Sequence, residues 1–392
     1  MRAEILDFLL GSRRKATAAA CAFDSSRSWP ALVETCSEWR VLAQLNRRLT
    51  ELGVGLPAET RMRFRRLTAE AFLRTSRCVE RGAEAIGILS RAGIRCAGFK
   101  GVAAFGILYG GRMDRRLQDV DVLIRKEDLE TALSELTRAG YMPMTSGGLK
   151  DYVAFVRSCP GFAGNEAIAL ADRSGGSIDL HWRLGQLDTE TLLAGTQAVP
   201  LFGRTIPVVR APHCLTLAAH HALRNDFVPD EIIRDLLDFR DWLPWIEEHG
   251  QAQEAREFAK QNRLLGPLLA MAHLVEWFDE RSTAFAEGAP AVELSVAADL
   301  AELYQSQLKG GLLNADLVYL ANLNSIRQIV VGAGSGWSRY RAYMRAFEQT
   351  NGRAPIALGG RLRRFVFDAW RLPLRRWRLV RALVSAKNAG SR

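Results

Sequence analysis

The sequence has little of what membrane-spanning, zinc-stabilised or disulfide-stabilised proteins need. No apolar stretch in its 392 residues approaches the roughly 18 residues that a transmembrane helix requires. The six cysteines form no CxxC pair and none has a histidine at zinc-ligand spacing, which indicates reduced thiols. The apolar run near the N-terminus is interrupted by Asp7 and is too short for a signal peptide. These absences predict a cytoplasmic protein.

Acidic residues are scarce only at the C-terminal end of the chain. The formal net charge is +10 and the isoelectric point is about 9.6. Residues 361–392 contain ten Lys or Arg and a single acid, Asp368, so the rest of the chain is nearly neutral. A basic balance favours an anionic partner such as a nucleotide, a nucleic acid or an anionic lipid. The charge therefore predicts a basic tail rather than a basic groove across the whole molecule.

The chain divides into helical and mixed regions, and its length suits two or three domains. Apolar residues recur at helical spacing through residues 1–78 and again after Pro212. Short apolar or alternating segments between these regions predict strands interleaved with helices, which favours an α+β fold. We expect a helical N-terminal region, a core with a small mixed sheet, a second helical region, and a linker with a basic tail, at 1–78, 79–210, 211–350 and 351–392.

Two aspartates stand in one predicted strand, Leu117–Ile124. Asp119 and Asp121 are two residues apart, so on a strand they project to the same side. Two neighbouring carboxylates repel each other unless a cation lies between them, and Mg²⁺ prefers carboxylate and phosphate oxygens. The pattern is also compatible with an edge strand that bears two solvated carboxylates.

A third carboxylate, Asp179, lies between apolar residues in the predicted strand Ser177–Arg183. If this strand is a neighbour of Leu117–Ile124, Asp179 joins Asp119 and Asp121. Three carboxylates can hold two Mg²⁺ ions, one activating a hydroxyl group and one neutralising a triphosphate. Asp179 is then also a candidate general base.

Several basic residues are candidates for phosphate binding. Lys100-Gly101 stands at a predicted strand-to-helix turn, where glycine lets the backbone approach a phosphate and the helix N-terminus favours an anion. Arg115 and Arg116 precede the aspartate strand, and His181 faces the same side as Asp179. For each of them the alternative is a structural role: a solvated surface charge for the basic residues and a hydrogen-bonded histidine for His181.

Together these residues resemble the DNA polymerase β-like nucleotidyltransferase superfamily, and more closely its bacterial branch of uncharacterised nucleotidyltransferases. The usual Gly-Gly or Gly-Ser of the nucleotide-binding turn is replaced by Lys100-Gly101, as in that branch. A weaker match continues through Leu215–Leu243, with His220 or His221 and Asp235 or Asp238 as counterparts of family residues. The motifs that carry the resemblance are Phe99-Lys100-Gly101, Tyr109, Arg115, Asp119–Ile124, Gly140-Tyr141 and Ile178–Trp182.

The resemblance implies a Mg²⁺-dependent enzyme, with Mn²⁺ as a substitute, that transfers a nucleoside monophosphate from a nucleoside triphosphate to an acceptor hydroxyl. It implies Asp119, Asp121 and Asp179 as metal-binding and catalytic residues. The nucleotide-binding residues would be Lys100, Gly101, Arg115, Arg116 and His181. Two alternatives stand beside it: a catalytically idle fold that serves as a binding or scaffold module, and a transferase that uses a nucleotide-sugar donor.

The basic tail has three alternative interpretations. Apolar residues recur at helical spacing within Leu374–Ala386, with arginines filling most other positions. Such a helix could lie on a membrane surface, bind RNA, or dock on the protein's own body with its arginines in water. The first would make the protein a peripheral membrane protein.

Overall fold

The computed structural model describes residues 2–23, 27–144, 166–172, 176–185, 187–224, 229–280 and 284–308. All of these belong to one structural unit, residues 1–144 and 166–310. The linker and tail expected at 351–392 lie outside the described residues, as does the expected helical region beyond residue 308.

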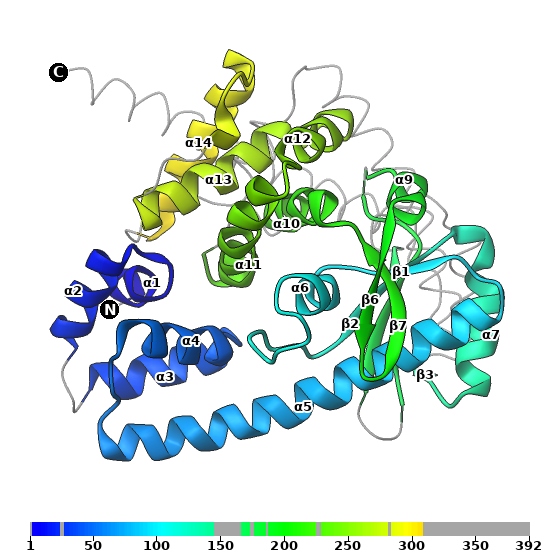
Figure 1. Cartoon of the computed structure of the whole chain (residues 1–392), viewed down its shortest axis with the longest axis horizontal. Coiled ribbons are helices and arrows are strands. Elements are labelled where there is room, and N and C mark those ends of the chain that lie inside the picture. The colour runs from blue at the N-terminus through cyan, green and yellow to red at the C-terminus, as the bar shows by residue number, and fades with distance from the viewer. Residues whose placement is uncertain are drawn as a thin grey trace, which may run out of the picture. The chain divides into compact units, whose positions relative to one another are not determined.

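The N-terminal region is helical, as its periodicity predicts (Figure 1). In α4, Leu42, Leu45 and Leu49 fall on one face and are buried, because residues three or four apart share a helix face. The helix ends at Gly53, which adopts the left-handed conformation that glycine tolerates best. The helices here are α1 (Arg2–Leu10), α2 (Arg13–Ala22), α3 (Ser28–Glu38) and α4 (Leu42–Leu52).

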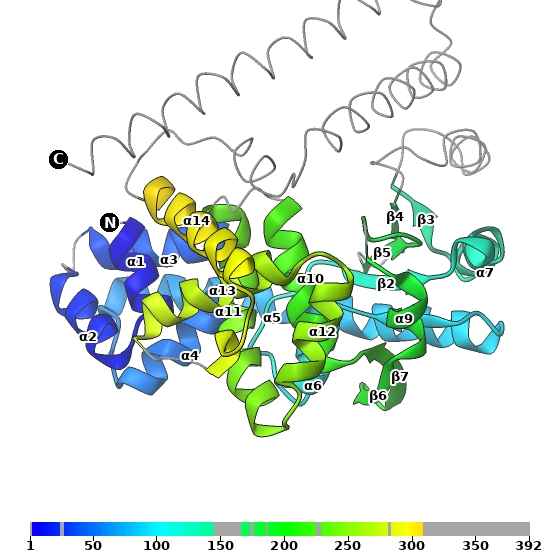
Figure 2. The same ribbon diagram turned by 90° about the horizontal axis from the view of Figure 1, so that it is seen from above.

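A single long helix, α5 (Ala58–Arg91), connects this region to the sheet. It packs against α3 and α4 near its start and against strands of the sheet farther along (Figures 1 and 2). The expected domain boundary at 78/79 falls inside this helix. One rigid element therefore spans the helical region and the mixed core.

The core is an α+β arrangement around a seven-stranded mixed sheet in the described part of the chain, with the order β3-β4-β5-β2-β1-β7-β6. The pairs β1–β7 and β2–β5 are parallel, and the others are antiparallel. The hairpin of β6 and β7 was not predicted from the sequence. The strands are β1 (Cys96–Gly98), β2 (Val120–Ile124), β3 (Met142–Pro143), β4 (Ala167–Ala171), β5 (Ser177–His181), β6 (Thr196–Leu201) and β7 (Arg204–Val209).

The two faces of β2 have different neighbours. Val120 is fully buried and faces Gly82 of α5, and the side chains of Val122 and Ile124 share its face because strand residues alternate. Asp121 therefore projects from the opposite face. The helix α6 (Gly101–Ile107) packs against β2, β6 and β7. The apolar residues of β2 thus anchor the strand on α5 and leave the carboxylate free to line a pocket.

The remaining helices complete the core and form the second helical region expected after Pro212 (Figure 1). No described helix is long and apolar enough to cross a membrane. The five described cysteines are free thiols. These elements are η1 (Lys126–Asp128), α7 (Leu129–Arg138), α9 (Thr189–Ala194), α10 (Ala211–Arg224), α11 (Pro229–Glu248), α12 (Ala252–Gln261), α13 (Leu265–Asp279), η2 (Ala284–Ala286) and α14 (Ala291–Leu308).

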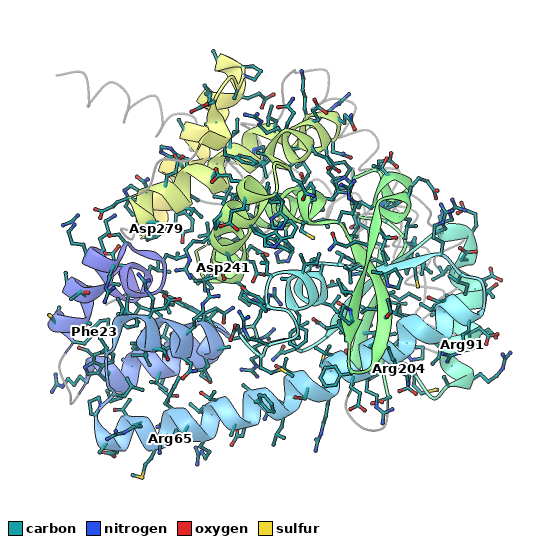
Figure 3. All side chains as sticks on the ribbon, viewed as in Figure 1. Phe23, Arg65, Arg91, Arg204, Asp241 and Asp279 are labelled. Atoms are coloured by element: carbon teal, nitrogen blue, oxygen red, sulfur yellow. The ribbon has the colours of Figure 1, made fainter. Side chains whose placement is uncertain are left out.

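One carboxylate joins the helical regions to the core. Asp241 of α11, labelled in Figure 3, accepts a hydrogen bond from the Tyr109 hydroxyl at 2.7 Å. It also forms an ion pair with Arg47 of α4 at 2.6 Å. Because these three residues come from α4, from the segment after α6 and from α11, the network fixes both helical regions against the core.

The contact between α5 and β2 gives a first prediction. A Cβ added at Gly82 would lie 2.6 Å from Val120 Cβ, well inside contact distance. Overpacking costs about 1–3 kcal/mol and alanine favours a helix by about 1 kcal/mol over glycine, so we expect Gly82→Ala to lose up to about 2 kcal/mol of unfolding free energy. Urea denaturation measures the change.

The matched control is Gly87→Ala on the same helix. A Cβ there would meet only the ends of two arginine side chains, at 3.4 and 3.8 Å. This variant should gain up to about 1 kcal/mol. Equal stabilisation by both substitutions would contradict close packing of α5 on β2.

Candidate functional site

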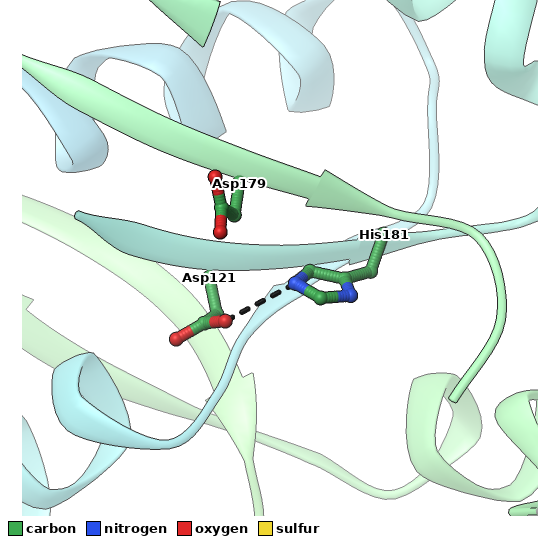
Figure 4. A group of neighbouring side chains, drawn as sticks. All are labelled: Asp121, Asp179 and His181. Atoms are coloured by element: carbon green, nitrogen blue, oxygen red, sulfur yellow. Dashed lines mark hydrogen bonds and ion pairs between the residues drawn. The ribbon is translucent and has the colours of Figure 1, made fainter. Parts of the chain in front are cut away.

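The three predicted carboxylates line one pocket. Asp121 and Asp179 are register partners on the parallel strands β2 and β5, so their side chains project side by side (Figure 4). Asp119 directly precedes β2 and lines the same pocket. The strands that carry Asp121 and Asp179 are therefore neighbours, which is the condition for Asp179 to join the other two aspartates.

Two basic side chains form hydrogen bonds to Asp121 and none to Asp179. Lys100 Nζ donates a hydrogen bond to Asp121 Oδ1 at 2.8 Å, and His181 Nε2 donates to the same oxygen at 3.1 Å (Figure 4). Burial acts to raise the pKa of Asp121, but the Lys100 charge and the His181 contact outweigh it and lower that pKa. Asp121 is therefore held as a carboxylate.

The pKa values of the other two carboxyl groups, Asp179 and Asp119, are shifted in the opposite direction. Removal from water, and then the Asp121 and Asp119 charges, raise the pKa of Asp179. Asp119 is more exposed, yet loss of solvent and the Asp121 charge raise its pKa against the opposing effect of Lys100 and Arg234. The positive charges of Lys100 and, at Asp119, of Arg234 thus offset only part of the effect of burial and of the neighbouring carboxylates.

Ligand atoms of Asp121, Asp179 and His181 lie within 4.8 Å of one another, close enough to share a metal ion. This group overlaps with the predicted set of three aspartates but contains His181 in place of Asp119. The His181 ring stands edge-on to Phe99, with centroids 5.0 Å apart, and its Nδ1 is buried without a hydrogen-bond partner. His181 is not among the residues that line the pocket.

The strand-to-helix turn has the expected position and an unusual backbone. Lys100 has φ 51° and ψ −120°, a conformation that side chains rarely adopt, and α6 begins at the next residue. A Cβ on Gly101 would lie 3.0 Å from Arg115 Cζ, so only glycine fits beneath this arginine. The turn thereby directs the Lys100 side chain to the carboxylates.

The predicted arginines have different surroundings. Arg115 Nε donates to both oxygens of Asp238, at 2.9 and 2.7 Å, and both side chains are largely buried. Burial raises the pKa of Asp238 to about 6, while Arg115 acts to lower it. Arg116 forms no such pair within the described residues, and its Nε is buried without a hydrogen-bond partner. Arg115 therefore has a structural partner, whereas Arg116 has none.

The pocket has a volume of about 200 Å³ and contains residues that the sequence did not single out as its lining. His221 lies 2.7 Å from Asp235, a pair that joins α10 to α11. Both were noted only as counterparts in the weaker part of the resemblance. Arg40 and Arg234 carry no local sequence signal, because each is one arginine among many. The added lining residues are Arg40, Leu117, Gln118, His221, Arg234 and Asp235.

Comparison with known proteins gives one family. The family model described as "Uncharacterised nucleotidyltransferase" matches residues 25–279, more than half of the chain. A crystal structure of an antigenic nucleotidyltransferase-like protein from Paracoccidioides brasiliensis matches at 15% identity and a TM-score of 0.32. The match covers 50% of this chain and 93% of that one. No curated protein matches the chain.

The buried pair of Arg115 and Asp238 gives a second prediction. Asp238→Ala leaves the Arg115 guanidinium buried without its carboxylate, which should cost about 3–5 kcal/mol of unfolding free energy. Chemical denaturation of the full chain measures this loss. Replacing both residues together, as Arg115→Met with Asp238→Leu, should recover most of it, since no uncompensated charge is left.

Glu135→Ala is the surface control for this experiment. It breaks the exposed pair of Glu135 with Arg138 and should cost less than about 1 kcal/mol. A loss in Asp238→Ala no larger than in this control would show that the buried pair does not hold the wall of the pocket.

Proposed function

The chain belongs to the uncharacterised nucleotidyltransferase family, and we propose that it transfers a nucleoside monophosphate from a nucleoside triphosphate to an acceptor hydroxyl group. The acceptor would be a small molecule, a peptide or an RNA. The observation that carries this proposal is the side-by-side placement of Asp121 and Asp179 on parallel strands, with Asp119 in the same pocket.

The donor atoms of this site fit a divalent cation. Asp179 has no hydrogen-bond or ion-pair partner within the described residues, and the pKa values of Asp179 and Asp119 are raised by burial and by neighbouring carboxylates. Carboxylate oxygens suit Mg²⁺ and Mn²⁺. Asp119, Asp121 and Asp179 would hold one or two such ions, which would supply charge neutralisation at the triphosphate and activation of the acceptor hydroxyl.

Other residues would position the site. His181 would orient Asp121 through the hydrogen bond from Nε2, a role consistent with its place outside the pocket lining. Lys100 and the backbone at Gly101 would contact phosphate oxygens at the start of α6. Arg116, which also lines the pocket, would do the same, whereas Arg115 would hold the pocket wall through Asp238.

Asp179 is the candidate to accept the proton of the acceptor hydroxyl, because Asp121 is already engaged by Lys100 and His181. The acceptor oxygen would then form a bond to the α-phosphorus. The bond between that phosphorus and the bridging oxygen to the β-phosphate would break, and pyrophosphate would leave. Arginine and lysine near the β- and γ-phosphates would stabilise the charge that develops on the leaving group.

Calorimetric titration of each nucleoside triphosphate, with and without Mg²⁺, tests this function. We expect Mg²⁺-dependent binding of at least one triphosphate, and a loss of about tenfold or more in Asp121→Asn and Asp179→Asn, because each removes one negative charge from the metal site. Asp128→Asn, which makes the same change in η1 outside the pocket lining, should bind like the unmodified chain.

The same titrations separate the alternatives. An idle binding module would bind nucleotide without Mg²⁺, or not at all, and would be insensitive to both aspartate variants. A nucleotide-sugar transferase would prefer a nucleoside diphosphate sugar over every triphosphate under Mg²⁺. Either result would overturn the proposed reaction.

A further inference from the structure

Besides Arg115, three arginines line the carboxylate pocket, and they come from three separate parts of the chain. Arg40 stands in the turn after α3, Arg116 in the loop before β2, and Arg234 on α11. They are far apart in the sequence, and only the fold brings them together. The pocket therefore has a cationic group in addition to its four aspartates, Asp119, Asp121, Asp179 and Asp235.

No described carboxylate forms an ion pair with any of these three arginines, although Arg234 acts at longer range to lower the pKa of Asp119. The other cationic residues of the pocket have partners: Lys100 pairs with Asp121, and Arg115 pairs with Asp238. Within the described residues, the side chains of Arg40, Arg116 and Arg234 form no ion pair and no hydrogen bond. An anionic ligand would supply the missing partner.

The arginines also lie close enough to repel one another. Loss of solvent, followed by the charges of Arg74, Arg40 and Arg234, lowers the pKa of Arg116. Its Nε is buried and has no hydrogen-bond partner. Gathering like charges around an unsatisfied donor is unfavourable in the free protein, and it is the arrangement that binds a multiply charged anion.

The backbone at Arg40 supports the same interpretation. Arg40 follows the end of α3 with φ 63°, and the neighbouring Val41 amide donates back to the Cys36 carbonyl. This is the helix-ending motif in which glycine is favoured, so an arginine here costs stability. Lys100, also in the pocket, has a positive φ as well. Strained residues of this kind concentrate at binding sites.

We propose that Arg40, Arg116 and Arg234 form a phosphate-binding subsite of the carboxylate pocket. Guanidinium groups bind phosphate oxygens through paired hydrogen bonds, and three of them match a group with two or more negative charges. The phosphates are either the β- and γ-phosphates of the donor or a phosphate on the acceptor. The existence of the subsite does not depend on the proposed function. The assignment of the phosphate to the donor or to the acceptor does rest on it.

The subsite gives the N-terminal helices a part in substrate binding. Arg40 belongs to the region expected at 1–78, and Arg234 belongs to the second helical region. Each of these regions contributes a guanidinium group to a pocket whose predicted metal-binding carboxylates lie on β2, on β5 and directly before β2. Neither helical region is then a separate module, since the subsite is incomplete without both.

Titration of inorganic pyrophosphate into the full chain, in metal-free buffer with a chelator, tests the subsite independently of the aspartates. We expect binding that weakens about tenfold or more in Arg40→Gly, Arg116→Ala and Arg234→Ala, because each removes charge-assisted hydrogen bonds. Arg61→Ala, an equal charge change on the exposed face of α5, should leave the affinity unchanged. Pyrophosphate binding that is absent, or equal in all variants, overturns the proposal.

Arg40→Gly keeps the experiment interpretable. Glycine is the residue that the turn after α3 favours, so this variant should unfold at the same or a higher temperature than the unmodified chain. Weaker pyrophosphate binding in a protein of undiminished stability identifies the guanidinium as a ligand. Unchanged pyrophosphate binding in this stable variant would remove Arg40 from the subsite and overturn the three-arginine proposal.

A second titration assigns the phosphate and separates the two proposals. Under Mg²⁺, loss of nucleoside triphosphate affinity without loss of monophosphate affinity, in the arginine variants, assigns the subsite to the donor. Unchanged triphosphate affinity beside lost pyrophosphate affinity assigns it to a phosphorylated acceptor. Asp121→Asn should bind metal-free pyrophosphate at least as tightly as the unmodified chain, because it removes a negative charge and frees Lys100. A failure of the metal site therefore appears only in the Mg²⁺-dependent experiment.

Discussion

The electrostatic cost of gathering three carboxylates beside one another is the constraint on which the site depends. Asp121 is stabilised by Lys100 and His181, which lower its pKa, whereas the pKa values of Asp119 and Asp179 are raised. The positive charges of Lys100 and, at Asp119, of Arg234 offset only part of the cost of burying three acids together. The chain accepts this cost, together with the unusual backbone of Lys100, at a position where a cation and a triphosphate would offset it.

The packing around β2 and its pairing with β5 fix the positions of these carboxylates. Close packing of Gly82 of α5 on Val120 fixes β2 from one side, and α6 packs on β2 as well. The parallel pairing with β5 then sets Asp121 directly beside Asp179. A shift of one residue in this register would turn the carboxylate away from its partner, because strand side chains alternate. Tight packing is therefore a condition for the site as well as for stability.

The helical regions supply pocket residues that the sheet does not, among them Arg40 and Arg234. Asp241 ties α4 and the segment after α6 to α11, and the Arg115–Asp238 pair ties the loop before β2 to the same helix. These contacts hold Arg40 and Arg234 around the carboxylates that the sheet supplies. The division into a core with carboxylates and surrounding helices with guanidinium groups gives the pocket two kinds of charge. This is the arrangement that a metal-bound polyphosphate would require.

The α+β class, the strands that carry Asp121 and Asp179, and the turn at Lys100-Gly101 could all be predicted from the sequence. These features depend on local periodicity and on motifs a few residues long, so they are visible along the chain. The sequence did not predict the hairpin of β6 and β7, whose residues lack a clear alternating pattern. It also could not separate Arg115 from Arg116, which are adjacent and chemically identical. Folding places Arg115 against Asp238 and leaves Arg116 without an ion-pair partner among the described residues, in a pocket that Arg40 and Arg234 also line. The sequence could not show this, because these residues are separated by long stretches of chain and are brought together by packing.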